Sequence, residues 1–287
     1  MGLQSVVVGV DGSPASGRAL GWIAAQMTSP DQHIHAVHGY SVNAEWALMA
    51  VPFDTTPWLA ELEDLVRSEW VQPARGTAAT VDGRVVEAPA ADALIRVADD
   101  EDADAIVVGY QGQTRWSRHH LGGTASKLLH RSNRPVIIAG EATRVAPMAS
   151  RVVVGCEKPD SAIRLLNWAL DVAEPRGLPV VAVHVVEPLA WIDTYYPVDM
   201  VAVKQAARQR FEEVLAEIRS EREVTVELTS EARAGSALTE LTDASRGADL
   251  LVVGSHHHGP LGDFLSGSIT SHTPLLADCP VAVIPFS

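Results

Sequence analysis

The sequence predicts an α/β protein built from two tandem domains, each with an open, twisted, five-stranded parallel sheet. Short valine-rich runs alternate with helical patterns in the order βαβαβαβαβ, which is typical of a parallel sheet with helices on both faces. The whole pattern starts again near residue 150. In each copy, one apolar run ends at a glycine-rich loop, and a further glycine after that loop precedes a helical pattern.

The duplication is visible in residues that recur at a nearly constant offset. Arg151–Glu157 mirrors Ser5–Asp11, and further pairs lie 146 residues apart (168 − 22) or 145 apart (267 − 122): Trp22 and Trp168, His38 and His184, Gly122 and Gly267, Pro135 and Pro280. A constant offset over the whole chain indicates duplication of a complete domain. We expect one domain at residues 1–143 and a second at 150–287, which together form an internal pseudo-dimer.

The first strand and helix have the clearest local signals. Gln4–Val10 is a valine-rich run that predicts a buried strand. Ser13 followed by Pro14 is typical of a helix start, with serine as the N-cap and proline at the first helical position. The helix that follows is predicted to bury one side, formed by Leu20, Ile23, Ala24 and Met27.

Periodicity predicts the remaining elements of the first domain. We expect strands at His33–His38, at about 78–86, at Ala105–Val108 and at Pro135–Ala139. Helices are expected at Trp58–Trp70, Ala91–Asp99 and Thr124–His130. The segment from Ser41 to Pro57 is rich in alanine, tryptophan and proline and is predicted to be irregular.

Composition excludes several classes of protein. The apolar content is 47% and the net charge is −14, and no apolar run approaches the roughly 20 residues of a membrane-spanning helix. The acidic balance, with no cluster of Lys and Arg, argues against nucleic acid as a partner. Because a strand-like run follows Met1–Gln4 directly, we expect no leader and a cytoplasmic location. Cys156 and Cys279 lack metal-ligand spacing and are predicted to be packing residues.

The glycine loops carry the functional signal. In the first copy the residues concerned are Gly109, Gly112, Gly122, Gly123 and Thr124, and in the second they are Gly254, Gly267, Ser268 and Thr270. A strand, a glycine loop and a helix N-terminus together suit a phosphate group. Glycines let the backbone come close, free N–H groups point at the anion, and the helix dipole favours negative charge.

These motifs resemble those of the universal stress protein family, specifically of its tandem members. The family's nucleotide signature is Gly, two residues, Gly, nine residues, Gly, then Ser or Thr, and it runs here from Gly109 through Gly112 to Gly122. The early family motif, a valine strand into Gly-x-Asp-Gly-Ser, is present as Gly9–Ser13. The resemblance covers both copies. It implies a Rossmann-like fold of the adenine nucleotide alpha hydrolase type and a role in the stress response.

The resemblance also implies a site and a ligand. ATP, bound with Mg or Mn, is expected at the carboxyl ends of the strands, as is general for open α/β sheets. Gly9 would allow close approach, Asp11 would hydrogen-bond the adenosine portion, and the glycine loop with Thr124 would line the phosphate path. The equivalent second-copy positions are Gly155, Glu157, Gly254, Gly267, Ser268 and Thr270. A homodimer and a regulatory protein partner of unknown identity are expected, with no catalytic residue and no metal site of the protein's own.

The two copies depart from the family pattern in different ways. In the first, Gly123 stands at the Ser/Thr position, and Thr124 is expected to replace the missing hydroxyl. In the second, Glu157 is one methylene longer than an aspartate, and His257 stands where the first loop has Gly112. We therefore expect ATP in the first domain and leave open whether the second domain binds it.

Simpler roles compete with these assignments. Asp11 is also typical of a helix cap, and His38 and His184, at strand ends, are typical of structural histidines. Trp22 and Trp168 are predicted to lie in the core or at a contact between the domains. The run His256–His258 favours a zinc site only weakly, because consecutive loop residues point in different directions and no carboxylate or cysteine lies at ligand spacing.

Three classes of function follow. The first is a nucleotide-binding regulatory protein, the second an enzyme such as a slow ATPase, and the third a non-catalytic interaction scaffold whose nucleotide sites have decayed. The sequence lacks the Gly-x-x-x-x-Gly-Lys-Ser/Thr loop and the Gly-x-Ser-x-Gly elbow of well-known hydrolases. We therefore favour binding over catalysis.

Overall fold

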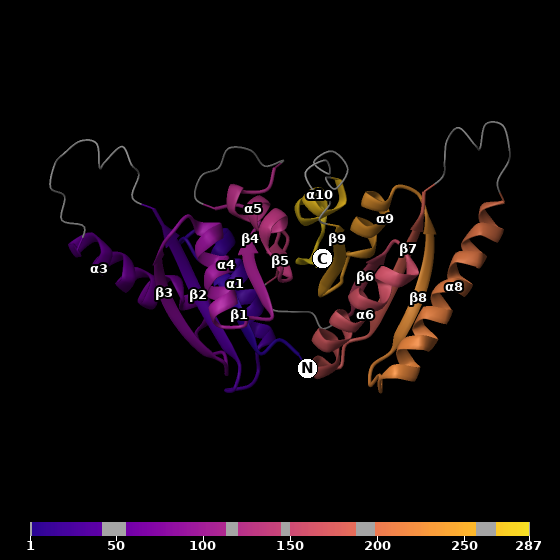
Figure 1. Ribbon diagram of the computed structural model, residues 1–287, viewed down its shortest axis with the longest axis horizontal. Helices are drawn as coiled ribbons and strands as arrows, with labels where there is room; N and C mark the ends of the chain where they lie inside the picture. The colour runs from indigo at the N-terminus through magenta and orange to yellow at the C-terminus, as the bar shows by residue number, and fades with distance from the viewer. Residues whose placement is uncertain are drawn as a thin grey trace. The chain divides into compact units, whose positions relative to one another are not determined.

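The computed structural model describes residues 2–41, 56–112, 120–144, 150–187, 199–256 and 268–286. The chain divides into two compact units, Leu3–Ala146, and Pro147–Ser287 together with Met1–Gly2. We call the unit Leu3–Ala146 the first lobe and the other the second lobe. Both are α/β structures in which strands and helices alternate (Figure 1).

The first lobe contains a parallel sheet in the order β3-β2-β1-β4-β5. Its elements are β1 (Ser5–Gly9), α1 (Pro14–Gln26), β2 (His33–Tyr40), α3 (Thr56–Leu65), the π-helical turn η1 (Val66–Trp70), the 3-10 turn η2 (Gln72–Ala74), β3 (Thr80–Glu87), α4 (Ala90–Asp100), β4 (Ala105–Gly109), α5 (Gly123–Arg131) and β5 (Val136–Ala139).

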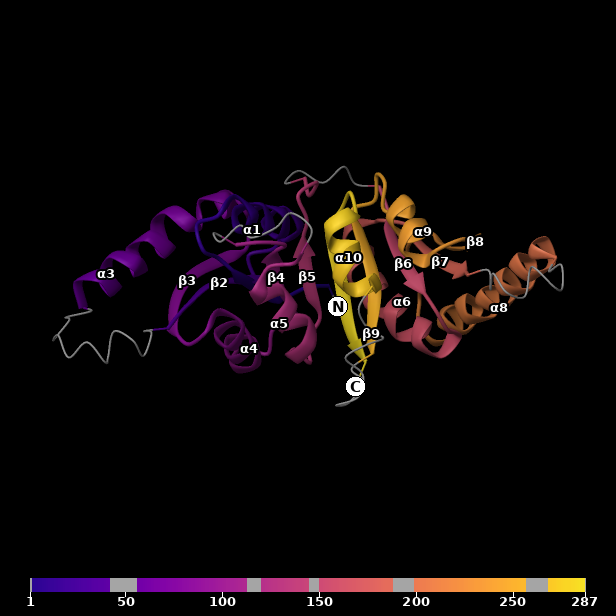
Figure 2. The same cartoon turned by 90° about the horizontal axis from the view of Figure 1, so that it is seen from above.

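Helices cover both faces of this sheet, as the alternation predicts. In Figure 2, α1 and α3 lie on one side of the strands, and α4 and α5 lie on the other. Contacts of α1 with β4 and of α4 with β2 agree with that arrangement. The strand order reverses between β1 and β4. The connections that leave the carboxyl ends of these two strands therefore run in opposite directions and leave a crevice between them, and open α/β sheets bind ligands in such a crevice.

The predicted helix start at Ser13 is confirmed. Ser13 is the N-cap of α1, and its hydroxyl oxygen accepts a hydrogen bond from the Ser16 N–H at 3.2 Å. Pro14 occupies the first helical position, where its missing N–H costs nothing. On the buried side, Leu20 and Ile23 are fully buried, which fixes α1 against the sheet.

The helix expected at Trp58–Trp70 is present but changes its geometry. It begins as α3 at Thr56 and continues from Val66 as the wider π-helical turn η1. This turn packs closely on β3, since a Cβ added at Gly83 would lie only 3.1 Å from Val66 Cγ1. Most of the segment predicted to be irregular, residues 42–55, lies outside the described residues.

The second lobe repeats the arrangement, with the parallel order β10-β9-β6-β7-β8. Its elements are β6 (Val152–Cys156), α6 (Pro159–Ala173), the 3-10 turn η3 (Glu174–Arg176), β7 (Val180–Val186), α8 (Met200–Glu221), β8 (Leu228–Ala234), α9 (Ala237–Ala244), β9 (Leu250–His256), α10 (Ser268–Leu276) and β10 (Val281–Phe286).

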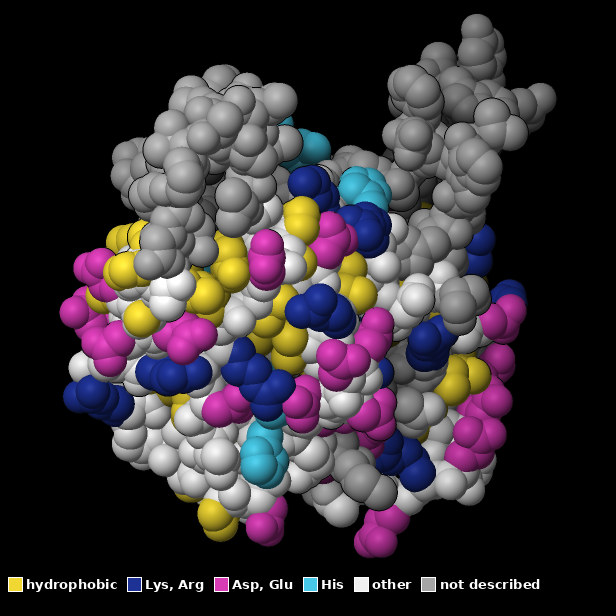
Figure 3. Space-filling model, turned by 60° about the vertical axis from the view of Figure 1, so that its left-hand side comes forward, with side chains coloured by type: hydrophobic (Ala, Val, Ile, Leu, Met, Phe, Trp, Pro, Cys, Tyr) yellow, Lys and Arg dark blue, Asp and Glu magenta, His cyan; other side chains and the backbone are white. Residues whose placement is uncertain are grey.

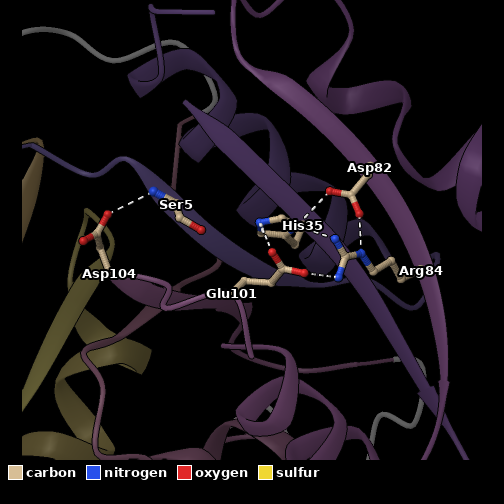
Figure 4. A network of polar contacts seen from close by, with 6 residues as sticks. All are labelled: Ser5, His35, Asp82, Arg84, Glu101 and Asp104. Carbon is tan, nitrogen blue, oxygen red and sulfur yellow. Dashed lines mark hydrogen bonds and ion pairs between the residues drawn. The ribbon is translucent and has the colours of Figure 1, made fainter. Parts of the chain in front are cut away.

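A polar network holds the edge of the first-lobe sheet opposite the glycine loop (Figure 4). The buried side chain of His35, on β2, donates from Nδ1 to Asp82 Oδ1 on β3 at 2.8 Å. Arg84 bridges Asp82 and Glu101, which follows α4. Partial burial by itself would raise the pKa of Asp82, but hydrogen bonds from His35 and Arg84 outweigh it and lower the pKa. The hydrogen bond from Arg84 lowers the pKa of Glu101.

The surface carries many charged side chains of both signs. On the face shown in Figure 3, Lys and Arg side chains are scattered among Asp and Glu side chains and form no continuous basic patch. Within the described residues, no helix combines the length and the apolar character needed to cross a membrane.

Candidate functional site

A cavity of about 280 Å³ lies at the carboxyl ends of β1, β2 and β4 in the first lobe. All seven residues that the sequence predicts for a first-lobe site line it: Gly9, Asp11, Gly109, Gly112, Gly122, Gly123 and Thr124. They come from three separate stretches of chain. The parallel sheet brings them together because the carboxyl ends of its strands share one edge.

One wall of this cavity is apolar. It is formed by Val10 after β1, Val37 on β2, Leu94 on α4 and Val108 on β4. Gly9 packs against the same wall, since a Cβ added there would lie 3.0 Å from Val108 Cγ1 and 3.1 Å from Leu94 Cδ1. Such a wall suits the flat, apolar face of an aromatic ring.

The glycine loop is held by its own packing. A Cβ at Gly109 would lie 2.7 Å from the carbonyl carbon of Ala15, and one at Gly112 would lie 2.5 Å from Asp11 Oδ2. The Gly122 N–H donates to the Tyr110 carbonyl at 2.8 Å, which closes the loop. Glycine at 109 is therefore required by contact with the protein backbone, whereas a side chain at 112 would have to displace the Asp11 carboxylate. At Gly123, by contrast, no described atom lies within 4 Å of an added Cβ.

The two helices that begin at this edge present different N-termini. In α1 the Ser13 side chain takes up one of the N–H groups that a helix leaves without an intrahelical partner. In α5 the N-cap is Gly122, which makes no side-chain capping bond. Gly123, Thr124 and Ala125, the first residues of α5, line the cavity. This helix start therefore has backbone donors and a favourable dipole for an anion in the cavity.

Asp11 has the capping role that its position suggests. Its Oδ1 accepts a hydrogen bond from the Ser13 N–H at 3.0 Å, and its own N–H donates to Ser16 Oγ at 3.4 Å. The other carboxylate oxygen faces Gly112, so Asp11 connects the first turn to the glycine loop while it lines the cavity. No pattern in the sequence indicated this contact between residues about 100 positions apart.

The two repeated histidines are structural, as predicted. The Nδ1–H of His38 donates to the Val10 carbonyl at 2.8 Å, and that of His184 donates to the Cys156 carbonyl at 2.9 Å. Both bonds tie the end of the second strand of a lobe to the residue that ends or follows its first strand. The shared offset was the signal that revealed this equivalence.

The second lobe has its own cavity, of about 390 Å³. Three predicted residues line it, Gly155, Glu157 and Gly254. Thr270 lies in the first turn of α10 and is not among the described lining residues, whereas its neighbour Ile269 is. Ser268 begins α10, but its side chain is not described, and Gly267 and His257 lie outside the described residues.

Among the residues of the second cavity that sequence reasoning missed is Phe286. It lies at the end of β10 and lines the cavity beside Gly254. Comparison of the two repeats contains a weak signal for this residue. The equivalent first-lobe position, 145 residues earlier (286 − 145), is the acidic Glu141, so the residue type changes from acidic to aromatic between the copies.

Comparison with known proteins identifies the class. The model of the universal stress protein family matches the chain twice, at residues 2–140 and 148–285. This chain belongs to that family, as a tandem member.

Its relatives have the same two-domain length. The universal stress protein Rv2623 of Mycobacterium tuberculosis (strain ATCC 25618 / H37Rv) is 29% identical over 290 residues, which cover 97% of this chain and 95% of the relative. Universal stress protein Rv2005c of the same strain is 28% identical, with coverages of 98% and 96%. A crystal structure of a universal stress protein from Archaeoglobus fulgidus DSM 4304 shares the fold, with a TM-score of 0.66, 17% identity and 99% coverage of both chains.

Proposed function

We propose that the first lobe binds ATP and that the protein is a nucleotide-dependent regulator of the stress response. One observation carries this proposal. The start of α5, which has no side-chain cap, and the glycine loop line the same cavity as an apolar wall of Val10, Val37, Leu94 and Val108. Donors for phosphate and a surface for an aromatic ring thus lie in one site, as a nucleotide requires.

The orientation of the nucleotide follows from the two ends of the cavity. The base packs against Val37, Leu94 and Val108, which belong to the apolar wall of the cavity. The phosphates lie toward Gly122, Gly123 and Thr124, where backbone donors begin. Asp11, between the two ends, accepts a hydrogen bond from a ribose hydroxyl.

A divalent cation fits this proposal. No Lys or Arg is among the described residues that line the cavity, and the chain has a net charge of −14. The charge of a triphosphate is then offset mainly by backbone donors and by a bound Mg or Mn, whose preferred ligands are phosphate and carboxylate oxygens.

The first test is mass spectrometry of the freshly purified, denatured protein, which identifies and counts co-purified nucleotide. Gly123→Glu then tests the site. No described atom lies within 4 Å of a Cβ at position 123, so the fold should survive, while the new carboxylate meets the phosphates. Like charges about 4 Å apart repel by about 4 kcal/mol at an effective dielectric constant near 20, so ATP affinity should fall at least about 100-fold.

Lys127→Glu is the matched control, because it changes the charge of the same helix at an exposed position that does not line the cavity. Its ATP affinity should fall much less than that of Gly123→Glu, because an exposed charge one helical turn further along acts on the phosphates through water, where the dielectric constant is about 80. ATP affinity that is equal in Gly123→Glu and the wild type would overturn the assignment. Absence of nucleotide, with no calorimetric signal on adding ATP and Mg, would favour a scaffold with decayed sites. Release of phosphate from bound ATP would favour a slow ATPase.

A further inference from the structure

Two helical segments at equivalent places in the two repeats carry opposite charges. One is α3, Thr56–Leu65, and the other is the part of α8 that lies 146 residues later, at 202–211 (56 + 146, 65 + 146). α3 has no Lys or Arg and three acidic residues: Glu61, Glu63 and Asp64. The segment 202–211, which we call the basic stretch, has no Asp or Glu and three basic residues: Lys204, Arg208 and Arg210.

Neither segment is buried by its own lobe. Leu62 is the buried residue of α3, and in α8 no residue from Val201 to Arg210 is buried. Figure 1 shows α3 reaching outward from β3, the edge strand of the first lobe. The ring of Trp58 is 43% exposed, and the side chain of Val201 is 71% exposed. A short helix that packs so little is marginal by itself, because most helical stability in proteins comes from packing.

On each helix, apolar and charged side chains share one face. Trp58 and Glu61 lie three residues apart on α3, and residues three or four apart are neighbours on a helix surface. On α8, Val201, Lys204 and Arg208 follow one another at the same kind of spacing. α3 therefore presents an apolar and acidic face, and α8 presents an apolar and basic face of similar length.

Most of these charges are not used within the lobes. Five of the six charged side chains have no ion pair within the described residues: Glu61, Asp64, Lys204, Arg208 and Arg210. Glu63 lies 3.4 Å from Arg67, one turn further along its own helix. Asp199, just before the basic stretch, is the N-cap of α8 and accepts hydrogen bonds from two backbone N–H groups. Opposite charges in contact attract, whereas repulsion from the rest of an acidic chain is screened beyond about 10 Å at 0.1 M salt.

From these observations we propose that α3 of one copy of the chain docks on the basic stretch of a second copy. Trp58 packs against Val201, and the acidic side chains of α3 pair with the basic side chains of α8. The contact is heterologous, since two different surfaces meet, so each copy keeps one helix for a further copy unless a ring closes. Two helical faces of this length bury less than about 1,200 Å², which places the contact among weak, transient interfaces.

The first experiment uses wild-type protein in 0.1 M salt at about 100 µM, a concentration that populates weak contacts. A carbodiimide joins a carboxylate to an amine in contact with it and takes up the water that this condensation releases. Lysine occurs at positions 127, 158 and 204, so few links are possible. Equal parts of unlabelled and isotopically heavy chain are mixed, linked and digested, and mass spectrometry identifies the joined peptides.

We expect α3 joined to Lys204 in pairs of mixed isotope, which arise between two chains. These links should be at least about tenfold more frequent than links of α3 to the exposed Lys127, since several exposed ion pairs together favour the contact by about that factor. Peptide identities, not the mass of an assembly, are the readout, so the result does not depend on the homodimer expected from the family. Links of a single isotope alone, or no link from α3 to Lys204, would overturn the inference.

The second experiment reverses basic charges and keeps the lysine. Arg208→Glu/Arg210→Glu changes two exposed side chains and should lower the yield of links to Lys204 at least about tenfold. Lys127→Glu/Arg246→Glu is the matched control, because it changes the net charge equally at exposed positions outside both helices. Its yield should stay within about twofold of the wild type, and far-ultraviolet circular dichroism should show that both variants keep their helices.

A mixture of two variants then tests the pairing itself. Chains with Arg208→Glu/Arg210→Glu are combined with chains carrying Glu61→Lys/Asp64→Lys. Links between α3 and α8 should return, now between the introduced lysines of one chain and the introduced glutamates of the other. Equal link yields in the Arg208→Glu/Arg210→Glu variant and its control, or a mixture without such links, would refute the docking of α3 on α8.

Discussion

At the scale of single residues, equivalent positions in the two repeats have different neighbours. Gly109 and Gly254 both end an apolar strand, yet the first makes room for the backbone of Ala15 and the second for the ring of Phe286. A side chain at 109 would overlap backbone, and one at 254 would require the ring of Phe286 to move. A glycine in a nucleotide signature is therefore evidence of close packing first, and evidence of a ligand only when the remaining lining agrees.

The helix caps differ between the lobes in a way that can be measured. Ser13→Ala removes the side chain that caps α1, and such a loss costs about 1 kcal/mol of unfolding free energy. Ser161→Ala is the control, because the Ser161 hydroxyl only donates back to the Lys158 carbonyl and α6 has no side-chain cap. Urea unfolding followed by circular dichroism should show a lower midpoint for Ser13→Ala alone. Equal midpoints for the two variants would contradict the capping role.

Both thiols should be unreactive in the folded protein. Cys156 is 4% exposed and Cys279 is 3% exposed. Burial raises the pKa of Cys156 to about 12, and it raises the pKa of Cys279 as well, so almost no thiolate is present at pH 8. A chromogenic disulfide reagent should therefore react slowly with native protein and release two equivalents in urea. Fast release from the native protein would show that one thiol is accessible.

At the scale of elements, the sequence predicted what local periodicity and capping determine. The valine runs gave the strands β1, β4 and β6, and Ser13 gave the start of α1. The π-helical turn η1 was not predictable, because it depends on contact with Gly83 of a strand that follows it. The extension of β9 was not predictable either, since it depends on pairing with Phe286, about 30 residues further along the chain.

The parts of the candidate site that depend on local sequence were predictable, and the parts that depend on distant segments were not. The glycine signature predicted the loop and the start of α5, because its spacing is local. The apolar wall was missed, since Val37 and Leu94 come from β2 and α4 and nothing in their own segments marks them. The carboxyl-edge rule for parallel sheets predicted where such residues would meet, but not which residues they are.

The network of His35, Asp82, Arg84 and Glu101 makes the stability of the first lobe depend on pH. The folded state lowers the pKa of Asp82 and Glu101, so it binds protons on them less tightly than the unfolded chain does. Their contribution to stability is therefore present above the usual carboxyl pKa of about 4 and is lost as the pH falls through their lowered values.

Arg84→Met should remove the part of this contribution that Arg84 makes, while the hydrogen bond from His35 to Asp82 remains. The variant should unfold at a lower temperature than the wild type at pH 7, and the difference should shrink steadily toward pH 3. Arg233→Met is the control, since Arg233 lies 2.9 Å from the half-exposed Glu231, and such pairs contribute about 0–1 kcal/mol. Thermal unfolding at pH 7, 5, 4 and 3 measures both. A constant difference for Arg84→Met across this range would mean that packing, not charge, accounts for the loss.

At the scale of the whole molecule, the net negative charge opposes self-association. A chain with a net charge of −14 repels its own copies, and the repulsion acts over about 10 Å at 0.1 M salt. The same repulsion acts on an approaching nucleotide. Added salt should therefore strengthen both self-association and ATP binding, up to the point where it competes with Mg for the phosphates.

The homodimer expected from the family can be tested on this basis. Light scattering of the 30.6 kDa chain should give twice the monomer mass, and the dimer fraction at low protein concentration should rise between 50 and 500 mM NaCl, roughly the range over which the Debye length falls from above 10 Å to below 8 Å. If the dimer fraction falls with salt instead, the interface is held by ion pairs between acidic and basic residues. A monomer mass at every salt and protein concentration would rule out the homodimer.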